Sequence, residues 1–185
     1  MTDKNHGKVD PIKLFDQKTL NSNLNAISLY ITAFELLKTS VIDAVTNILV
    51  WLPDDLEQQR LFAVETGIPY DQRYERGMVP CANWLKRGEV ITEMDVDNLR
   101  LIRSHRNDLV HELPKYLIYS GADVQHLLLQ QARNLIMKID VWSARNDVLF
   151  SLSGYEEIDI TEIPDTEIKS GRLIILDYII SKVIA

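Results

Sequence analysis

The sequence has few of the features that several large classes of protein require. It contains a single cysteine, Cys81, which excludes an intramolecular disulfide and is typical of a reducing compartment. Its net charge is −7, so any contact with nucleic acid would depend on a local basic cluster and not on a generally positive surface. It has no run of about 18 apolar residues and no apolar signal-peptide core near its start. We therefore expect a cytoplasmic protein that does not enter a membrane.

Motifs of several enzyme classes are also missing. There is no glycine-rich phosphate loop and no G-x-S-x-G turn, which argues against nucleotide-dependent enzymes and hydrolases of those types. A metal site could be drawn from four neighbouring side chains, His105, Asp108, His111 and Glu112. However, His105 and His111 are six positions apart and cannot share one face of a helix. We expect neither a metal nor a cofactor.

Apolar residues at helical spacing are abundant. They make up 46% of the chain, and from Leu20 to Leu52 they recur at alternating steps of four and three, broken only at Lys38. This period predicts one long helix that starts at about residue 16 or 19 and ends at Trp51, before Pro53. Its length would make it the axis of a helical bundle.

The rest of the chain also reads as helices joined by short breaks. Thr92 begins the sequence T-E-M-D, which resembles a capping box, and an apolar stripe continues from there to Pro114. Other helices are predicted at residues 56–64, 82–86, 124–149 and 170–184, with a loop at 71–80. Residues 156–167 are acidic and alternate like a short strand or extended arm.

These patterns predict an all-α protein with the architecture of an up-and-down bundle. We expect residues 1–15 to be a loose lead-in and residues 16–153 to form the bundle. Residues 154–185 would then add an acidic arm and a final helix that packs on the bundle.

The densest group of titratable side chains lies at residues 101–117, which hold two of the four histidines. Here Arg106 falls on the apolar stripe between Ile102 and Leu109, where an apolar residue is expected. Such a local inconsistency often marks a functional site. The structural alternative is that the long side chain reaches the surface or pairs with a buried carboxylate.

Residues 106–111 read R-N-D-L-V-H. This resembles the R-x-x-x-x-H motif of the HEPN family of all-α domains, including the polar residue that the family favours after the arginine. The setting is similar too, because the motif lies on an amphipathic helix that follows a long one. Arg100 and His105 form a second pair at this spacing without the polar residue, and we take that pair as accidental. The resemblance covers residues 16–149.

Many HEPN domains are metal-independent endoribonucleases, and the resemblance implies this activity here, with RNA as the substrate. It also implies a homodimer with a composite site at its interface, and a role in toxin–antitoxin systems or antiphage defence, with an antitoxin or other protein as a further partner.

The residues suit cleavage of RNA by its own 2′-hydroxyl. His111 could transfer protons, and Arg106 could hold phosphate oxygens with its fork of donors. Asn107 shares a helix face with His111 and could orient the imidazole or the phosphate. Arg103 and Arg100 extend a basic cluster that could bind the substrate. One motif supplies one histidine, so a two-fold dimer would supply the second proton-transfer group.

Two departures from the family leave an alternative open. Members that are paired with nucleotidyltransferase antitoxins carry a tyrosine where this sequence has Leu113. Asp108 and Glu112 place negative charge around the motif, which would repel phosphate. The alternative is a non-catalytic, HEPN-like helical dimer that binds a protein partner as a regulatory or antitoxin subunit. Catalysis requires His111 exposed in a cleft with Arg106, whereas a structural role would bury it.

Overall fold

The structure is a computed structural model that describes residues 8–51, 56–66, 77–151 and 163–183. Within these ranges the chain forms helices and no named strand, and Val9 and Tyr119 make one isolated β-bridge. The helices are α1 Pro11–Phe15, α2 Gln17–Trp51, α3 Leu56–Thr66, α4 Met78–Arg87, α5 Glu93–His111, α6 Leu113–Ile118, α7 His126–Ser151 and α8 Gly171–Val183. The prediction of an all-α helical bundle is confirmed.

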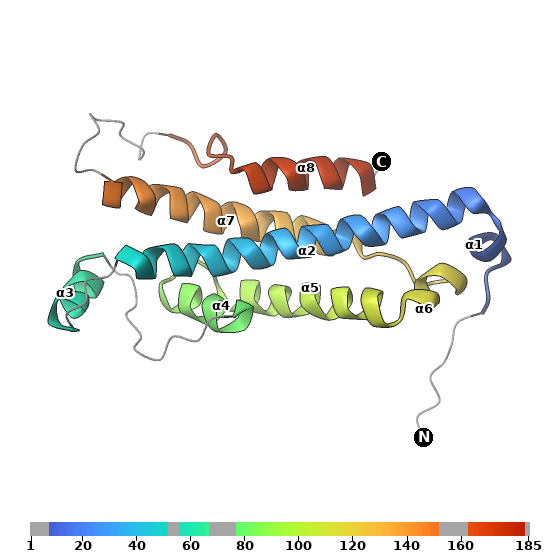
Figure 1. The fold of residues 1–185 in the computed structure, drawn as a ribbon, viewed down its shortest axis with the longest axis horizontal. Helices are drawn as coiled ribbons and strands as arrows, with labels where there is room; N and C mark the ends of the chain where they lie inside the picture. The colour runs from blue at the N-terminus through green and yellow to red at the C-terminus, as the bar shows by residue number, and fades with distance from the viewer. Residues whose placement is uncertain (1–7, 52–55, 67–76, 152–162, 184–185) are drawn as a thin grey trace, which may run out of the picture.

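Helix α2 is the axis of the bundle. At about 1.5 Å per residue, its 35 residues span roughly 52 Å, and it runs along the molecule with α7 beside it (Figure 1). It contacts α1, α4, α5, α6, α7 and α8. Its buried side chains follow the period seen in the sequence: Ile27, Tyr30, Phe34, Leu37, Val41, Val45 and Ile48. The predicted long helix is therefore confirmed, with both ends close to the expected positions.

Helix α5 carries the motif, and it starts at the predicted cap. The hydroxyl of Thr92 accepts a hydrogen bond from the N–H of Asp95, whose carboxylate accepts one from the N–H of Thr92. From α7, Lys138 donates to both carboxylate oxygens of Asp95. Burial acts to raise the pKa of Asp95, but the bonds from Lys138 and Thr92 outweigh it and hold the pKa below its usual range. These bonds fix the start of α5 against α7.

Helix α5 ends earlier than the sequence pattern indicates. Its last residue is His111, Glu112 is the C-cap, and α6 begins at Leu113. Pro114 has no N–H to donate to Val110, and its ring would clash with the carbonyl of that residue in a continuous helix. The prediction of one helix up to Pro114 is therefore wrong, and His111 lies at the end of a helix.

The described part of the expected N-terminal lead-in is ordered. The carboxylate of Asp10 caps α1, and Pro11 stands in the first turn, where proline is tolerated. The N–H of Asp10 donates to Ile118, and Lys13 donates to Ala122 and Asp123. Residues 8–15 are thus tied to the α6 end of the bundle and do not form the loose segment that was expected.

Two other stretches differ from the predictions. Helix α4 starts at Met78, within the range expected to be a loop. Pro80 does not prevent this, because it stands in the first turn of the helix, where a missing N–H costs no helical bond. The part of the acidic arm that the structure describes is a turn and not a strand, with the N–H of Glu167 donating to Pro164. Residues 156–162 of that arm lie outside the described residues.

The C-terminal helix packs on the bundle as predicted. Helix α8 contacts α2 and α7 (Figure 1). The carboxylate of Asp140 on α7 joins all three helices, because it accepts hydrogen bonds from the buried Ser40 of α2 and from Ser170, the residue before α8. Among the described residues, no helix combines the length and apolar character that crossing a membrane requires.

Candidate functional site

The side chains of α5 separate into a buried face and an exposed one. Val96, Leu99, Ile102 and Leu109 are buried, as the apolar stripe predicts. Arg100, Arg103, Asn107 and His111 follow one another at steps of three or four residues, which places them along the opposite, largely accessible face. The predicted site residues other than Arg106 therefore share one side of the helix.

Arg106 leaves that face and reaches toward α2. Its Nη2 lies 3.2 Å from Oε1 of Glu35, and its Nη1 donates to the amide oxygen of Asn107 at 3.3 Å. The guanidinium carbon lies 5.2 Å from the centre of the Phe34 ring, in cation–π range. Its Nε is buried and has no hydrogen-bond partner among the described residues. The guanidinium thus lies between α5 and α2 and donates to one side chain of each helix.

The structural alternative for Arg106 is correct in part. The arginine does pair with a carboxylate, but 43% of the Glu35 side chain is exposed, so this is not a buried ion pair. With 28% of the Arg106 side chain also exposed, solvent weakens the attraction between them. The guanidinium therefore remains accessible to a competing anion.

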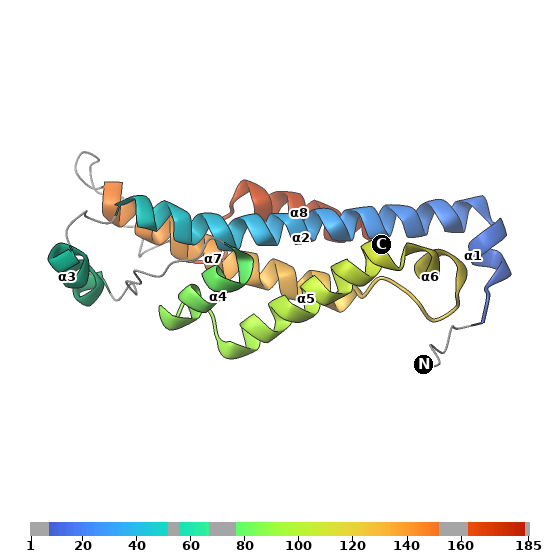
Figure 2. The ribbon, with the colours of Figure 1, turned by 60° about the horizontal axis from the view of Figure 1, so that its bottom comes forward.

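Arg106 lies on the wall of a cavity of about 420 Å³. The cavity opens where the start of α4 approaches α2 and α5, and Figure 2 shows α4 close to both. Its polar lining is Glu35, Lys38, Arg103, Arg106 and Asn107, and its larger apolar side chains are Phe34, Met78, Val79 and Pro80. Three cations thus face one carboxylate. The cavity can accept an anion.

The cavity brings together Arg103, Arg106 and Asn107, but not the other two predicted residues. His111 is exposed at the last position of α5, one helical turn beyond Asn107, and does not line the cavity. Arg100 lies one turn before Arg103 and pairs instead with Asp97, at 2.7 Å. His111 is therefore neither buried, as a structural role would require, nor placed with Arg106 in this cavity, as catalysis within a single chain would require.

The second histidine of the helix, His105, has a packing role. It is 4% exposed, and its Nε2 accepts a hydrogen bond of 3.1 Å from the N–H of Gln125. The imidazole packs edge-on against the rings of Tyr30 and Tyr116. Burial lowers its pKa. A neutral ring in this position holds the loop before α7 and is enclosed within the protein.

The sequence prediction missed the α2 side of the cavity. Glu35 and Lys38 are joined by a 3.0 Å ion pair, and both face Arg106 across the space between the helices. One signal was present in the sequence, because Lys38 interrupts the apolar stripe of α2 as Arg106 interrupts that of α5. The patterns of separate helices do not show that two such interruptions meet.

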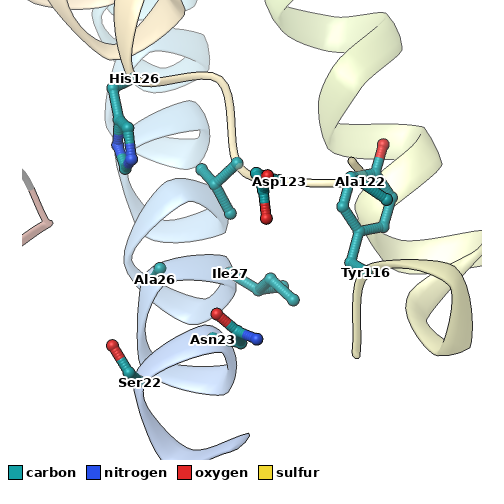
Figure 3. A pocket seen from close by; sticks show the side chains of 9 residues that line it. Ser22, Asn23, Ala26, Ile27, Tyr116, Ala122, Asp123 and His126 are labelled. Carbon is teal, nitrogen blue, oxygen red and sulfur yellow. The ribbon is translucent and has the colours of Figure 1, made fainter. Parts of the chain in front are cut away.

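A second, smaller cavity of about 200 Å³ lies between the first half of α2, α6 and the residues that lead into α7. Figure 3 shows Asn23 and Ile27 of α2 on one side of it and Tyr116 of α6 on the other. The amide nitrogen of Asn23 is buried without a hydrogen-bond partner among the described residues. The carboxylate of Asp123, also in its wall, is already paired with Lys13. This cavity contains no arginine.

No protein-family model matches the sequence, and neither a curated protein nor a solved structure matches the chain. The HEPN resemblance therefore rests on residues 106–111 and their place on α5. Within the described residues, no three histidine, cysteine, aspartate or glutamate side chains gather in a way that could hold a metal ion.

Proposed function

We propose that the protein is a metal-independent endoribonuclease of HEPN type. The observation that carries this proposal is the convergence of Arg103, Arg106 and Asn107 on one accessible cavity, with His111 exposed one turn along the same helix. Two arginines that face a cavity in a chain of net charge −7 form the local basic cluster that phosphate binding needs.

The proposed reaction needs no group from outside the RNA and the protein. A base removes the proton of a 2′-hydroxyl, the 2′-oxygen forms a bond to the adjacent phosphorus, and the bond from phosphorus to the 5′-oxygen breaks. An acid gives a proton to that 5′-oxygen, which leaves a 2′,3′-cyclic phosphate and a 5′-hydroxyl. Arg106, with Arg103 beside it, stabilises the charge on the phosphate oxygens.

The motif supplies one exposed histidine, His111, whereas the reaction needs two proton transfers. In the proposal, His111 of one copy acts as the base, and His111 of a second copy acts as the acid across a two-fold interface. Asn107, which accepts a hydrogen bond from Arg106, positions the guanidinium. The biological setting proposed with this activity is a toxin–antitoxin or antiphage system, in which a protein partner restrains the nuclease.

The test is RNA cleavage by the purified protein in the presence of EDTA, with end groups analysed. We expect the wild type to leave 2′,3′-cyclic phosphate ends, and we expect His111→Ala and Arg106→Ala each to lower the rate at least a hundredfold. His126→Ala removes another exposed histidine and serves as the matched control. Light scattering establishes the number of copies in each variant. The proposal is removed if the wild type leaves every RNA of a broad panel intact, or if the two variants cut as fast as the wild type.

Two observations favour a second candidate function. Arg106 already has an ion-pair partner in Glu35, and α8 carries an outward apolar group of Ile174, Ile175 and Tyr178. Such a surface fits a regulatory subunit that binds another protein. Absence of cleavage, together with an unchanged fold in Arg106→Ala, would favour this candidate.

A further inference from the structure

The cavity between α2, α4 and α5 has walls of two chemical kinds. Arg103, Arg106 and Asn107 form a polar side, and Phe34 and Val79 belong to an apolar side. Its volume of about 420 Å³ lies within the range of roughly 300–1,000 Å³ that is usual for small-molecule sites. A bare phosphate would leave the apolar side without a contact. The two walls together fit a flat apolar body that is attached to an anion.

A hydrogen-bonding pair stands at the same cavity. Lys38 Nζ lies 3.0 Å from Oε2 of Glu35, so an acceptor and a donor are side by side on α2. A carboxylate has more acceptor sites than the two bonds Glu35 makes to Lys38 and Arg106, and an ammonium has three donors. Both groups therefore keep capacity for a ligand.

We propose that this cavity holds one unpaired nucleobase, guanine by preference, next to the phosphate that Arg106 contacts. This inference rests on the proposed function for the identity of the polymer as RNA. Guanine presents two neighbouring donors, N1–H and N2–H, beside the acceptor O6. Glu35 accepts from the two donors and Lys38 donates to O6, an edge-on form of recognition that an unpaired base permits.

The other bases match this pair less well. Adenine and cytosine each present one amino group beside a ring nitrogen, and uracil presents one N–H between two carbonyl groups, so none offers two adjacent donors to a carboxylate. The guanidinium of Arg106, already over the Phe34 ring, supplies a planar cation against which a base can stack. The three cations exceed the single carboxylate by two charges, which suits the attached phosphate.

The test measures binding and not cleavage. Guanosine 3′-monophosphate, cytidine 3′-monophosphate and inorganic phosphate are titrated separately into the full chain by calorimetry. We expect the guanosine nucleotide to bind at least tenfold more tightly than either of the other two. In Lys38→Met, which removes the donor for O6, we expect the preference over the cytidine nucleotide to fall below threefold.

A cavity-filling variant tests the location. Val79→Trp is expected to weaken guanosine nucleotide binding at least tenfold, whereas Leu101→Trp, at an exposed position of α5 outside the cavity, leaves it unchanged. Circular dichroism checks that both variants fold. Equal affinity for the three ligands, or unchanged affinity in both Lys38→Met and Val79→Trp, overturns the inference. Guanosine binding with the expected variant effects but without RNA cleavage supports the base site and removes the ribonuclease proposal. RNA cleavage without base-dependent binding supports the ribonuclease proposal and removes the base site.

Discussion

Glu35 of α2 and Arg106 of α5 form an ion pair in the wall of the cavity, with Oε1 and Nη2 3.2 Å apart. The carboxylate occupies donors that a phosphate would use, so it is an internal competitor for any anionic ligand. Glu35 also accepts from Lys38, which means that one side chain restrains two of the three cations around the cavity.

Removing the charge of Glu35 should therefore strengthen anion binding. We expect Glu35→Gln to bind inorganic phosphate at least fivefold more tightly than the wild type, measured by calorimetry at low salt. Because the pair is partly exposed, the free energy of unfolding should change by less than about 1 kcal/mol. Glu93→Gln, which removes a glutamate paired with Lys86 outside this cavity, is the control and should leave phosphate affinity unchanged. Equal or weaker binding by Glu35→Gln would show that Arg106 is not the phosphate contact.

His105 should make stability depend on pH. Burial lowers its pKa from the ordinary value of 6.5, an effect that Lys115 supports and Asp108 opposes. The unfolded chain therefore takes up a proton at a higher pH than the folded protein. The contribution of the neutral ring is complete above pH 6.5 and is lost as the pH falls below 6.5 toward the folded-state pKa.

Replacing His105 with glutamine keeps an acceptor for Gln125 and removes the titration. We expect His105→Gln to show a shallower loss of unfolding free energy between about pH 6.5 and 5 than the wild type, measured by urea denaturation. His126→Gln changes an exposed histidine and should keep the wild-type slope. Identical slopes in wild type and His105→Gln would mean that His105 is accessible to protons in the folded state.

The turn after α4 contains a strained residue. Glu89 has a φ of 58°, in the left-handed region that favours glycine, and the next N–H, that of Val90, donates to Leu85 at 3.0 Å. We expect Glu89→Gly to raise the free energy of unfolding by about 1 kcal/mol, since an L-residue in this region costs roughly 1–2 kcal/mol. Glu89→Ala keeps the strain and should change stability little. A loss of stability in Glu89→Gly would mean that the Glu89 side chain stabilises the protein by more than the backbone strain costs.

Asp140 should control the attachment of α8. Replacing it with alanine leaves the fully buried hydroxyl of Ser40 without this partner and removes the acceptor for Ser170, so Asp140→Ala should cost about 2–3 kcal/mol. Hydrogen exchange should become faster in α8 than in α5. Asp177→Ala removes a more exposed carboxylate that pairs with Arg133 on α7, and should cost less than about 1 kcal/mol. Uniformly faster exchange in both helices would instead indicate a general loss of stability.

The sequence predicts those elements whose cause is local. The apolar period places α2 to within a few residues, and the residues that begin α5 carry their own cap. The predictions fail where the cause lies elsewhere in the chain. Nothing within residues 8–15 shows that Asp10 will bond to Ile118. The end of α5 is a different case, because its cause is local: the apolar stripe continues to Leu113, but Pro114 breaks the helix before that residue.

The same distinction applies to the site. Arg106 is conspicuous in the sequence because it stands on an apolar stripe, and the structure places it with Arg103 and Asn107 at one cavity. Its partners Phe34 and Glu35 come from a helix about seventy positions earlier, so only the packing of α2 on α5 shows them. The different environments of His105 and His111 likewise depend on what lies against each side of α5.

The order in which the helices are made matters for α2. Its principal partner, α7, begins at His126, long after α2 is complete. At a synthesis rate of about 5–20 residues per second, residues 52–125 take roughly 4–15 s to add. During that interval the long apolar face of α2 lacks its principal partner, and hydrophobic surface that is exposed transiently in this way is prone to aggregation.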